Sequence, residues 1–159
     1  IELYNRGLLI ADKNQLTPKM IDLNSKIADT YSLGNQPMEA EAYYDNSLDL
    51  ATQSAPRRAL QEKEKVADFY NTKSRFNEEI TMRKSSLEEL KKLKSPNAGV
   101  KKLELGDTIT SQRINYKIAN AYISQDKYNE AIPFLEKSIV EAGSDDDLVV
   151  QKDATRKFY

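Results

Sequence analysis

The sequence predicts an all-α fold: a right-handed α-solenoid of about eight helices packed as antiparallel pairs. Three stretches place an aliphatic residue, a small residue and a tyrosine at fixed offsets: Ile27–Tyr31, Val66–Tyr70 and Ile118–Tyr122. A polar turn and a second helical pattern come after each stretch, and that pattern ends in Ser-Leu or Ser-Ile at Ser47, Ser86 and Ser138. Such repetition of a helix-turn-helix unit is the signature of a repeat architecture. Five Gly and five Pro in the whole chain fit long helices with few breaks.

Four helices are expected in the first half of the chain, over about 1–14, 17–33, 37–52 and 56–72. Thr17 is expected to cap the second helix, with Pro18 at its first helical position. The segments Gly34–Pro37 and Ser54–Pro56 then supply the next two breaks.

Four more helices are expected over about 76–94, 107–125, 128–142 and 146–159. The repeat spacing from Ala67 to Ala119 is longer than that from Ala28 to Ala67, and the excess predicts an insertion at about 95–106. Acidic residues stabilise the N-terminus of a helix, so the acidic run Asp145–Asp147 is expected to begin the last helix. It is not expected to bind calcium, because it lacks the alternating ligand spacing of a calcium loop.

Small and aromatic residues predict how the paired helices pack. Small side chains allow close approach, at Ala28, Ala67 and Ala119 on the first helices and at Ala40 and Ala131 on the second. Aromatic rings are expected to fill the wider gaps: Tyr31, Tyr44, Tyr70, Phe76, Tyr122 and Tyr128. We interpret this ladder as packing rather than as a platform for ligand stacking, because it follows the helical packing offsets.

Composition narrows the possible functions. A chain of 159 residues is one domain or a short array. With no Cys and no His, thiol and imidazole chemistry, disulfides and zinc sites of these ligands are excluded, and we expect neither a metal, a cofactor nor an enzyme. The 24 basic and 25 acidic residues are nearly balanced, so nucleic-acid binding is not expected. No apolar run approaches the ~20 residues that span a bilayer, so this segment is not expected to contact a membrane.

The third repeat resembles the tetratricopeptide repeat family over Ile118–Tyr122, Lys127–Ile132 and Leu135–Ile139. The first repeat resembles it through Ala40, Tyr44 and Ser47. The middle repeat departs from the pattern: Glu79 stands where a small residue is expected, and Arg83 where an aromatic is expected. The consensus tryptophan is absent throughout.

This resemblance implies a single array over 1–159: a half-repeat at 1–16, repeats at about 17–54, 55–94 and 107–143, and a half-repeat at 146–159. The half-repeats suggest excision from a longer array. The repeats also resemble the sensor regions that precede histidine kinases or transcription-factor domains in bacteria, especially Bacteroidetes. The compartment stays open between periplasm and cytoplasm.

In this family the first helices of successive pairs line a concave groove, so the resemblance implies a candidate site. It comprises Asp22, Ser25, Asp29, Ser32, Gln61, Glu64, Asp68, Asn71, Arg113, Tyr116 and Asn120. Arg113 is the only base placed there, so a neutral or basic segment is the expected ligand. Arg57-Arg58 and the lysines around residues 91–102 are interpreted as a solvated face, because acidic residues are interleaved with them.

The sequence therefore favours a non-catalytic module that binds a protein or peptide, as the sensing or interaction region of a larger bacterial signalling protein such as a two-component sensor kinase. Two alternatives are a peptide-pheromone receptor of the same repeat class and an assembly scaffold without a signalling role. Apolar faces on the terminal helices also suggest self-association.

Overall fold

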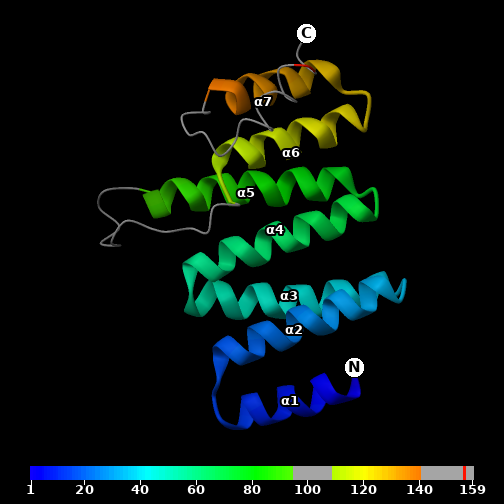
Figure 1. Ribbon diagram of the computed structural model, residues 1–159, viewed down its shortest axis with the longest axis vertical. Coiled ribbons are helices and arrows are strands. Elements are labelled where there is room, and N and C mark those ends of the chain that lie inside the picture. The colour runs from blue at the N-terminus through cyan, green and yellow to red at the C-terminus, as the bar shows by residue number, and fades with distance from the viewer. Residues whose placement is uncertain (95–108, 141–155, 157–159) are drawn as a thin grey trace. The chain divides into compact units, whose positions relative to one another are not determined.

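The computed structural model describes residues 1–94, 109–140 and 156, and these form helices and turns without a strand (Figure 1). Seven helices lie within the described residues: α1 Glu2–Lys13, α2 Thr17–Leu33, α3 Pro37–Ser54, α4 Pro56–Thr72, α5 Phe76–Lys94, α6 Ser111–Ile123 and α7 Tyr128–Val140. The all-α prediction is confirmed, and the number of helices is close to the expected eight.

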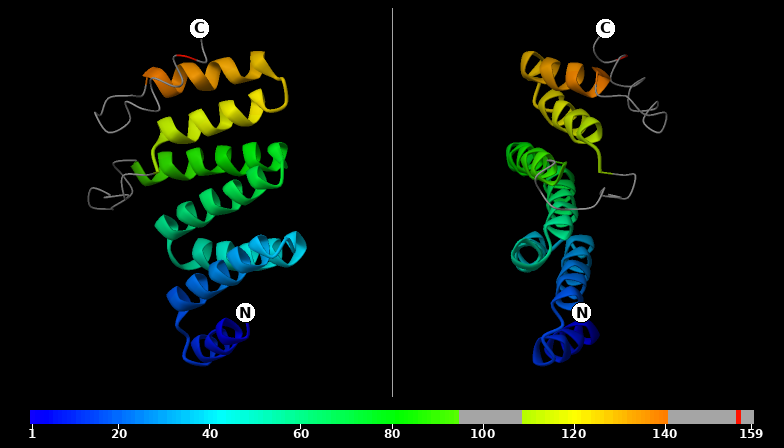
Figure 2. Two further views of the ribbon diagram at one scale, coloured as in Figure 1. Left: turned by 45° about the vertical axis from the view of Figure 1, so that its right-hand side comes forward. Right: turned by 90° about the vertical axis from the view of Figure 1, so that its left-hand side faces the viewer.

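The chain divides into two compact units, Ile1–Phe69 and Tyr70–Tyr159, with the boundary near the end of α4. The first unit contains α1, α2, α3 and most of α4, and the second contains α5, α6 and α7. Within each unit, consecutive helices run in opposite directions (Figure 2). The division into repeats stays a prediction. The expected insertion at 95–106, the acidic run at 145–147 and the half-repeat at 146–159 with its eighth helix lie outside the described residues.

The predicted small residues lie where the helices approach each other. Ala28, Ala40, Ala67 and Ala119 are fully buried, and Ala131 is 1% exposed. In the second unit, Ala119 and Ala131 form a core cluster with Leu135, on which Tyr122 and Phe134 pack. A larger side chain at these alanines would therefore push the paired helices apart.

Only some of the predicted aromatic residues are buried in the core. Tyr44 and Tyr70 are buried, and the Tyr44 ring packs on Phe69 with 5.2 Å between ring centroids. The prediction was wrong for Tyr128, which is 59% exposed. This residue opens α7, and its hydroxyl donates to Asp126 in the preceding turn at 3.0 Å, so the ring stays outside the helix pair.

Four helix-helix turns share one geometry. Each has a single left-handed residue that is not glycine: Gln15, Asn35, Ser74 and Asp126, with φ of 54°, 54°, 57° and 58°. The next residue donates its backbone N–H to the carbonyl five residues earlier, as in Leu16 to Ala11 and Arg75 to Tyr70. This is the hydrogen bond of a Schellman-type helix end, and the next helix begins after three or four residues.

Two predicted helix starts are wrong. Thr17 is not a cap, because α2 already begins at Thr17, and Leu16 is its N-cap without a side-chain hydrogen bond. The left-handed turn places Thr17 in helical backbone, whereas a cap needs a non-helical one. The start of α6 is Ser111 rather than about 107, and its cap is Thr110, whose hydroxyl accepts from the Arg113 N–H at 3.2 Å.

The middle repeat replaces part of the apolar core with an ion pair. Arg83 Nε lies 2.9 Å from Glu79 Oε1 one turn earlier on α5, and each residue is 1% exposed. The other Glu79 oxygen, Oε2, accepts from Asn71 Nδ2 of α4 at 2.8 Å. Both positions that break the repeat pattern are thus buried and paired.

Candidate protein-binding surface

Seven of the eleven predicted groove residues lie on two helices of the first unit, and the half-buried Ser32 is the last of them on α2. Asp22, Ser25 and Asp29 follow the spacing of three and four on α2, and Gln61, Glu64 and Asp68 do so on α4. Residues at this spacing share one face of a helix. We call these six residues the α2–α4 face. Asp29, Gln61 and Asp68 are exposed, Asp22 is half-buried, and Ser25 and Glu64 are buried.

Arg58 joins the two helices of this face. Its Nη2 lies 2.5 Å from Asp22 Oδ1 on α2, and its Nε lies 3.0 Å from Glu62 Oε1 one turn along α4. The Nε contact is an ion pair but does not meet hydrogen-bond geometry, so the bond to Asp22 is the directional one. Because its side chain is 32% exposed, Arg58 crosslinks α2 and α4 near the surface.

Glu62 is the buried partner of both Arg58 and Lys65. Its side chain is fully buried, and its Oε2 accepts from the Ser47 hydroxyl of α3 at 2.7 Å. Lys65 Nζ lies 3.6 Å from Glu62 Oε1 and donates to Ser25 Oγ of α2 at 2.7 Å. A buried carboxylate is stable only with such partners, so three helices are held in one arrangement around Glu62.

Asp29 has a separate partner. The Tyr44 hydroxyl of α3 donates to Asp29 Oδ1 at 2.6 Å. Burial, and then the hydrogen bond to Asp29, raise the pKa of Tyr44 above its ordinary range, so the phenol stays a proton donor. The Asp29 carboxylate is therefore held in a fixed direction while it stays exposed.

The other four predicted residues lie in the second unit. Asn71, at the end of α4, donates to the buried Glu79 of α5. Arg113, Tyr116 and Asn120 lie half-buried on α6, and Tyr116 packs on the Ala119 cluster, so part of its ring belongs to the core. The single groove across all three first helices stays a prediction.

Sequence reasoning missed the charged residues that organise the α2–α4 face. The expectation that Arg113 is the only base among the predicted residues left out Arg58 and Lys65, which contact Asp22 and Ser25. Arg58 was interpreted as part of a solvated face. One signal was present: Glu62 stands five residues before Ala67, where the other repeats have Leu23 and Ile114. A charge at an apolar repeat position predicts buried partners, and its neighbours at i−4 and i+3 are both basic.

Comparisons with known proteins support a tetratricopeptide-repeat fold. The tetratricopeptide repeat family model matches residues 112–139, which cover nearly all of α6 and α7 but less than half of the chain. The N-terminal domain of stress-induced protein-1 from C. elegans is 12% identical with a TM-score of 0.65, covering 90% of this chain and 98% of that domain.

A putative kinesin light chain with nearly identical TPR-like repeats from Podosopora anserina is 15% identical with a TM-score of 0.68, covering 99% of this chain and 75% of that structure. At such identities the likeness concerns the fold alone. No curated protein matches the sequence.

Two further observations concern only the described residues. None of their helices combines the length and the apolar character that crossing a membrane requires. Their acidic side chains form no group of three or more that could hold a metal ion. The matches indicate no enzyme family, and the repeat fold is consistent with a protein-interaction module.

Proposed function

We propose that this chain is a non-catalytic module that binds a protein or peptide segment through the α2–α4 face. The observation that carries the proposal is the crosslink made by Arg58 and Lys65. It fixes α2 against α4, so the exposed Asp29, Gln61 and Asp68 are presented by a rigid support. Preorganised polar groups bind more tightly than mobile ones, because less side-chain entropy is lost on association.

The charges of the face favour a neutral or basic partner. It carries four carboxylates, on Asp22, Asp29, Glu64 and Asp68, against the two bases Arg58 and Lys65. Arg58 is already engaged by Asp22 and Glu62, and Lys65 by Glu62 and Ser25. An acidic segment would therefore meet mainly like charge, which is unfavourable across a desolvated contact.

The cellular context is a finer proposal that rests on the resemblance. We propose that the chain is the sensing or interaction region of a bacterial signalling protein such as a two-component sensor kinase. The pheromone-receptor and scaffold alternatives differ in the segment that the parent gene would encode after Tyr159. A coiled coil with a kinase pattern would support the sensor, a DNA-binding helix-turn-helix the receptor, and further repeats the scaffold.

Self-association through α1 is also proposed. Leu3 and Ile10 lie two turns apart on one face of α1 and are 76% and 63% exposed. Exposed apolar side chains of this kind favour association between copies. Sedimentation velocity over a range of concentrations tests this, and Leu3→Ser with Ile10→Ser should return any dimer to monomer.

The binding proposal is tested by calorimetric titration at low salt with two peptide pools that differ only in carrying Lys or Glu at the same positions. The Lys pool should bind more tightly. Asp68→Lys should weaken that binding about fivefold or more. The matched control is Glu136→Lys on α7, also an exposed acid, which should leave binding unchanged. Tighter binding of the Glu pool would contradict the assigned polarity, and equal effects of the two variants would contradict the assigned face.

A further inference from the structure

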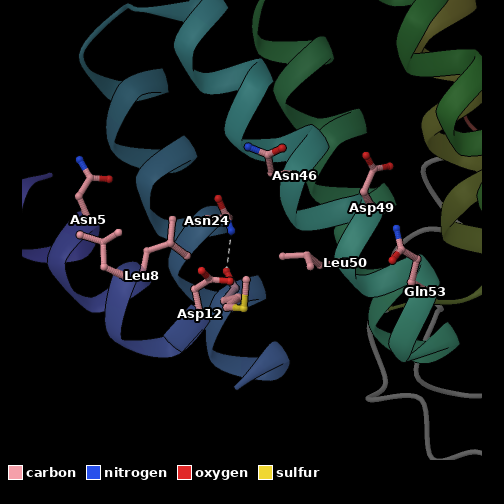
Figure 3. Close-up of a pocket in the computed structure, with 10 residues that line it drawn as sticks. Asn5, Leu8, Asp12, Asn24, Asn46, Asp49, Leu50 and Gln53 are labelled. Atoms are coloured by element: carbon pink, nitrogen blue, oxygen red, sulfur yellow. Dashed lines mark hydrogen bonds between the residues drawn. The ribbon is translucent and has the colours of Figure 1, made fainter. Parts of the chain in front are cut away.

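The first unit contains a pocket of about 600 Å³ on another side of α2 (Figure 3). Met20 and Asn24 of α2 form part of it, between residues of α1 and residues of α3. Each of these two residues is two positions from Asp22, a rotation of about 200° around the helix. The pocket and the α2–α4 face therefore lie on opposite sides of α2. Its volume falls in the range of ligand-binding clefts.

The pocket lining combines apolar, amide and acidic side chains. Its apolar residues are Leu8 and Leu9 of α1, Met20 of α2 and Leu50 of α3. Its amides are Asn5, Asn24, Asn46 and Gln53. The two charged groups are Asp12 on the α1 wall and Asp49 on the α3 wall, and no basic residue is among the described residues of the lining (Figure 3). The pocket therefore suits an occupant with apolar and cationic parts.

Asn24 lines this pocket, and its side-chain oxygen Oδ1 is an available hydrogen-bond acceptor. The residue is only 4% exposed, and its Nδ2 donates to the Met20 carbonyl of the same helix at 2.9 Å. That bond fixes the side-chain amide and leaves Oδ1 as the second polar atom. Oδ1 accepts no hydrogen bond from the described residues. This amide oxygen can therefore accept a hydrogen bond from an occupant of the pocket.

We propose that this pocket binds an extended peptide segment in which one apolar side chain is flanked by Lys or Arg two positions away on each side. A side-chain amide carries a donor and an acceptor, so Asn and Gln can pair with the N–H and C=O of a peptide backbone. A helix uses most of these groups internally, whereas an extended segment exposes them. Four amides in one pocket therefore favour an extended occupant over a helical one.

The spacing of the ligand follows from strand geometry. In an extended chain, residues at i, i+2 and i+4 point to the same side. In the proposed pose the central apolar residue would enter between Leu8 and Leu50, and the flanking bases would face Asp12 and Asp49, which also line the pocket. This site does not depend on the α2–α4 face, because its residues and helix surface are different.

The probe is the acetylated and amidated pentapeptide Lys-Val-Leu-Val-Lys, whose β-branched residues favour the extended form. Its counterpart replaces both Lys by Glu. Each is titrated into the whole isotope-labelled chain and followed by the backbone and side-chain amide signals. The Lys peptide should bind and shift the side-chain amide signals of Asn24 and Asn46, and the Glu peptide should bind at least about fivefold more weakly.

Three charge reversals, one of them a control, distinguish this pocket from the α2–α4 face. Asp49→Lys should weaken binding of the Lys peptide about fivefold or more, whereas Asp68→Lys and the α3 control Glu39→Lys should not. The proposal is overturned if millimolar peptide shifts nothing, or if both peptides bind equally. It is also overturned if shifts appear only around Asp22 and Asp29, which would support the α2–α4 face instead. A dimer broken by Asp49→Lys would overturn it as well, because a second copy would then be the occupant.

Discussion

Helices α3 and α5 are equivalent in the predicted division into repeats, but they use different chemistry. Ala40 and Tyr44 of α3 are a small residue and an aromatic, both buried, whereas the equivalent Glu79 and Arg83 of α5 are a buried ion pair. In both helices the two residues are four positions apart, one helical turn. The repeat position thus specifies that a side chain is buried, and the chemistry can vary as long as each polar atom finds a partner.

The contrast also shows what the ion pair requires. Burial of two charges carries a large desolvation penalty, which mutual attraction offsets only with further hydrogen bonds. Asn71 supplies one of these to Glu79. The equivalent residue in the first repeat is Ser32, whose side chain is shorter, so that repeat lacks the amide that supports the pair. In this chain the amide at Asn71 therefore accompanies the buried pair, and the serine at Ser32 accompanies the apolar one.

Removal of one partner of this pair should produce the largest effect. Arg83→Leu leaves Glu79 buried without its opposite charge, and we expect a loss of about 3–5 kcal/mol in the free energy of unfolding. Urea denaturation followed by circular dichroism measures it. The double variant Glu79→Ala with Arg83→Tyr gives α5 the residues of α3, and it should recover the wild-type midpoint or exceed it. A double variant as unstable as Arg83→Leu would show that α5 cannot accept the chemistry of α3.

The serines that come after these pairs give a matched second test. Ser47 and Ser86 are equivalent and fully buried, but only Ser47 donates to a carboxylate, at 2.7 Å to Glu62. Ser86 Oγ has no hydrogen bond among the described residues, and the residue equivalent to Glu62 in the next repeat is Ile114. Ser47→Ala should lower the free energy of unfolding by about 1.5–3 kcal/mol, whereas Ser86→Ala should leave it unchanged or raise it. Equal losses in the two variants would contradict the assigned partners.

The smallest effect on stability is expected from the exposed ion pair at the start of α5, compared with the same positions at the start of α3. Arg75 Nε contacts Glu78 Oε1 at 2.9 Å, and the equivalent residues before and in α3 are Gln36 and Glu39. The hydrogen bond from Arg75 lowers the pKa of Glu78 below its ordinary 4.5. The pair therefore stabilises the fold above the unfolded pKa, and this contribution is lost as pH falls through the lowered folded pKa. Arg75→Gln should return the pKa of Glu78 toward 4.5 in an NMR titration; an unchanged pKa would show that the N-terminus of α5 sets it.

The helical pairs could be predicted because periodicity and small residues act locally. Ala28 and Ala119 mark close contacts in any antiparallel pair, so their burial follows from the repeat alone. The role of Thr17 could not be predicted this way. A threonine before a proline suggests a cap, but the left-handed Gln15 sets where α2 begins. Glutamine has no strong preference for the left-handed conformation, so its sequence position does not predict it.

The position of the candidate surface was easier to predict than the ion pairs and hydrogen bonds that its residues make. Spacing placed Asp22 and Asp29 on one face of α2, as the structure has them. Which partners they take depends on residues of other helices, 36 positions away for Arg58 and 15 for Tyr44. The sequence around Asp22 and Asp29 gives no sign of these partners, and the one signal lay at Glu62 on another helix. The sequence therefore suggested a more acidic surface than the structure shows.

The four turns with a left-handed residue bear on how such a chain folds. Each closes a hairpin of helices through a hydrogen bond between residues only five positions apart. Closing so short a loop loses little chain entropy, so a folding nucleus can start at any of the four hairpins and grow by adding neighbours. Gln15, Asn35, Ser74 and Asp126 all adopt the same left-handed conformation, so this turn accepts several different residue types. A gene encoding such turns can lose, gain or exchange whole helical hairpins while each remaining hairpin keeps its own closure.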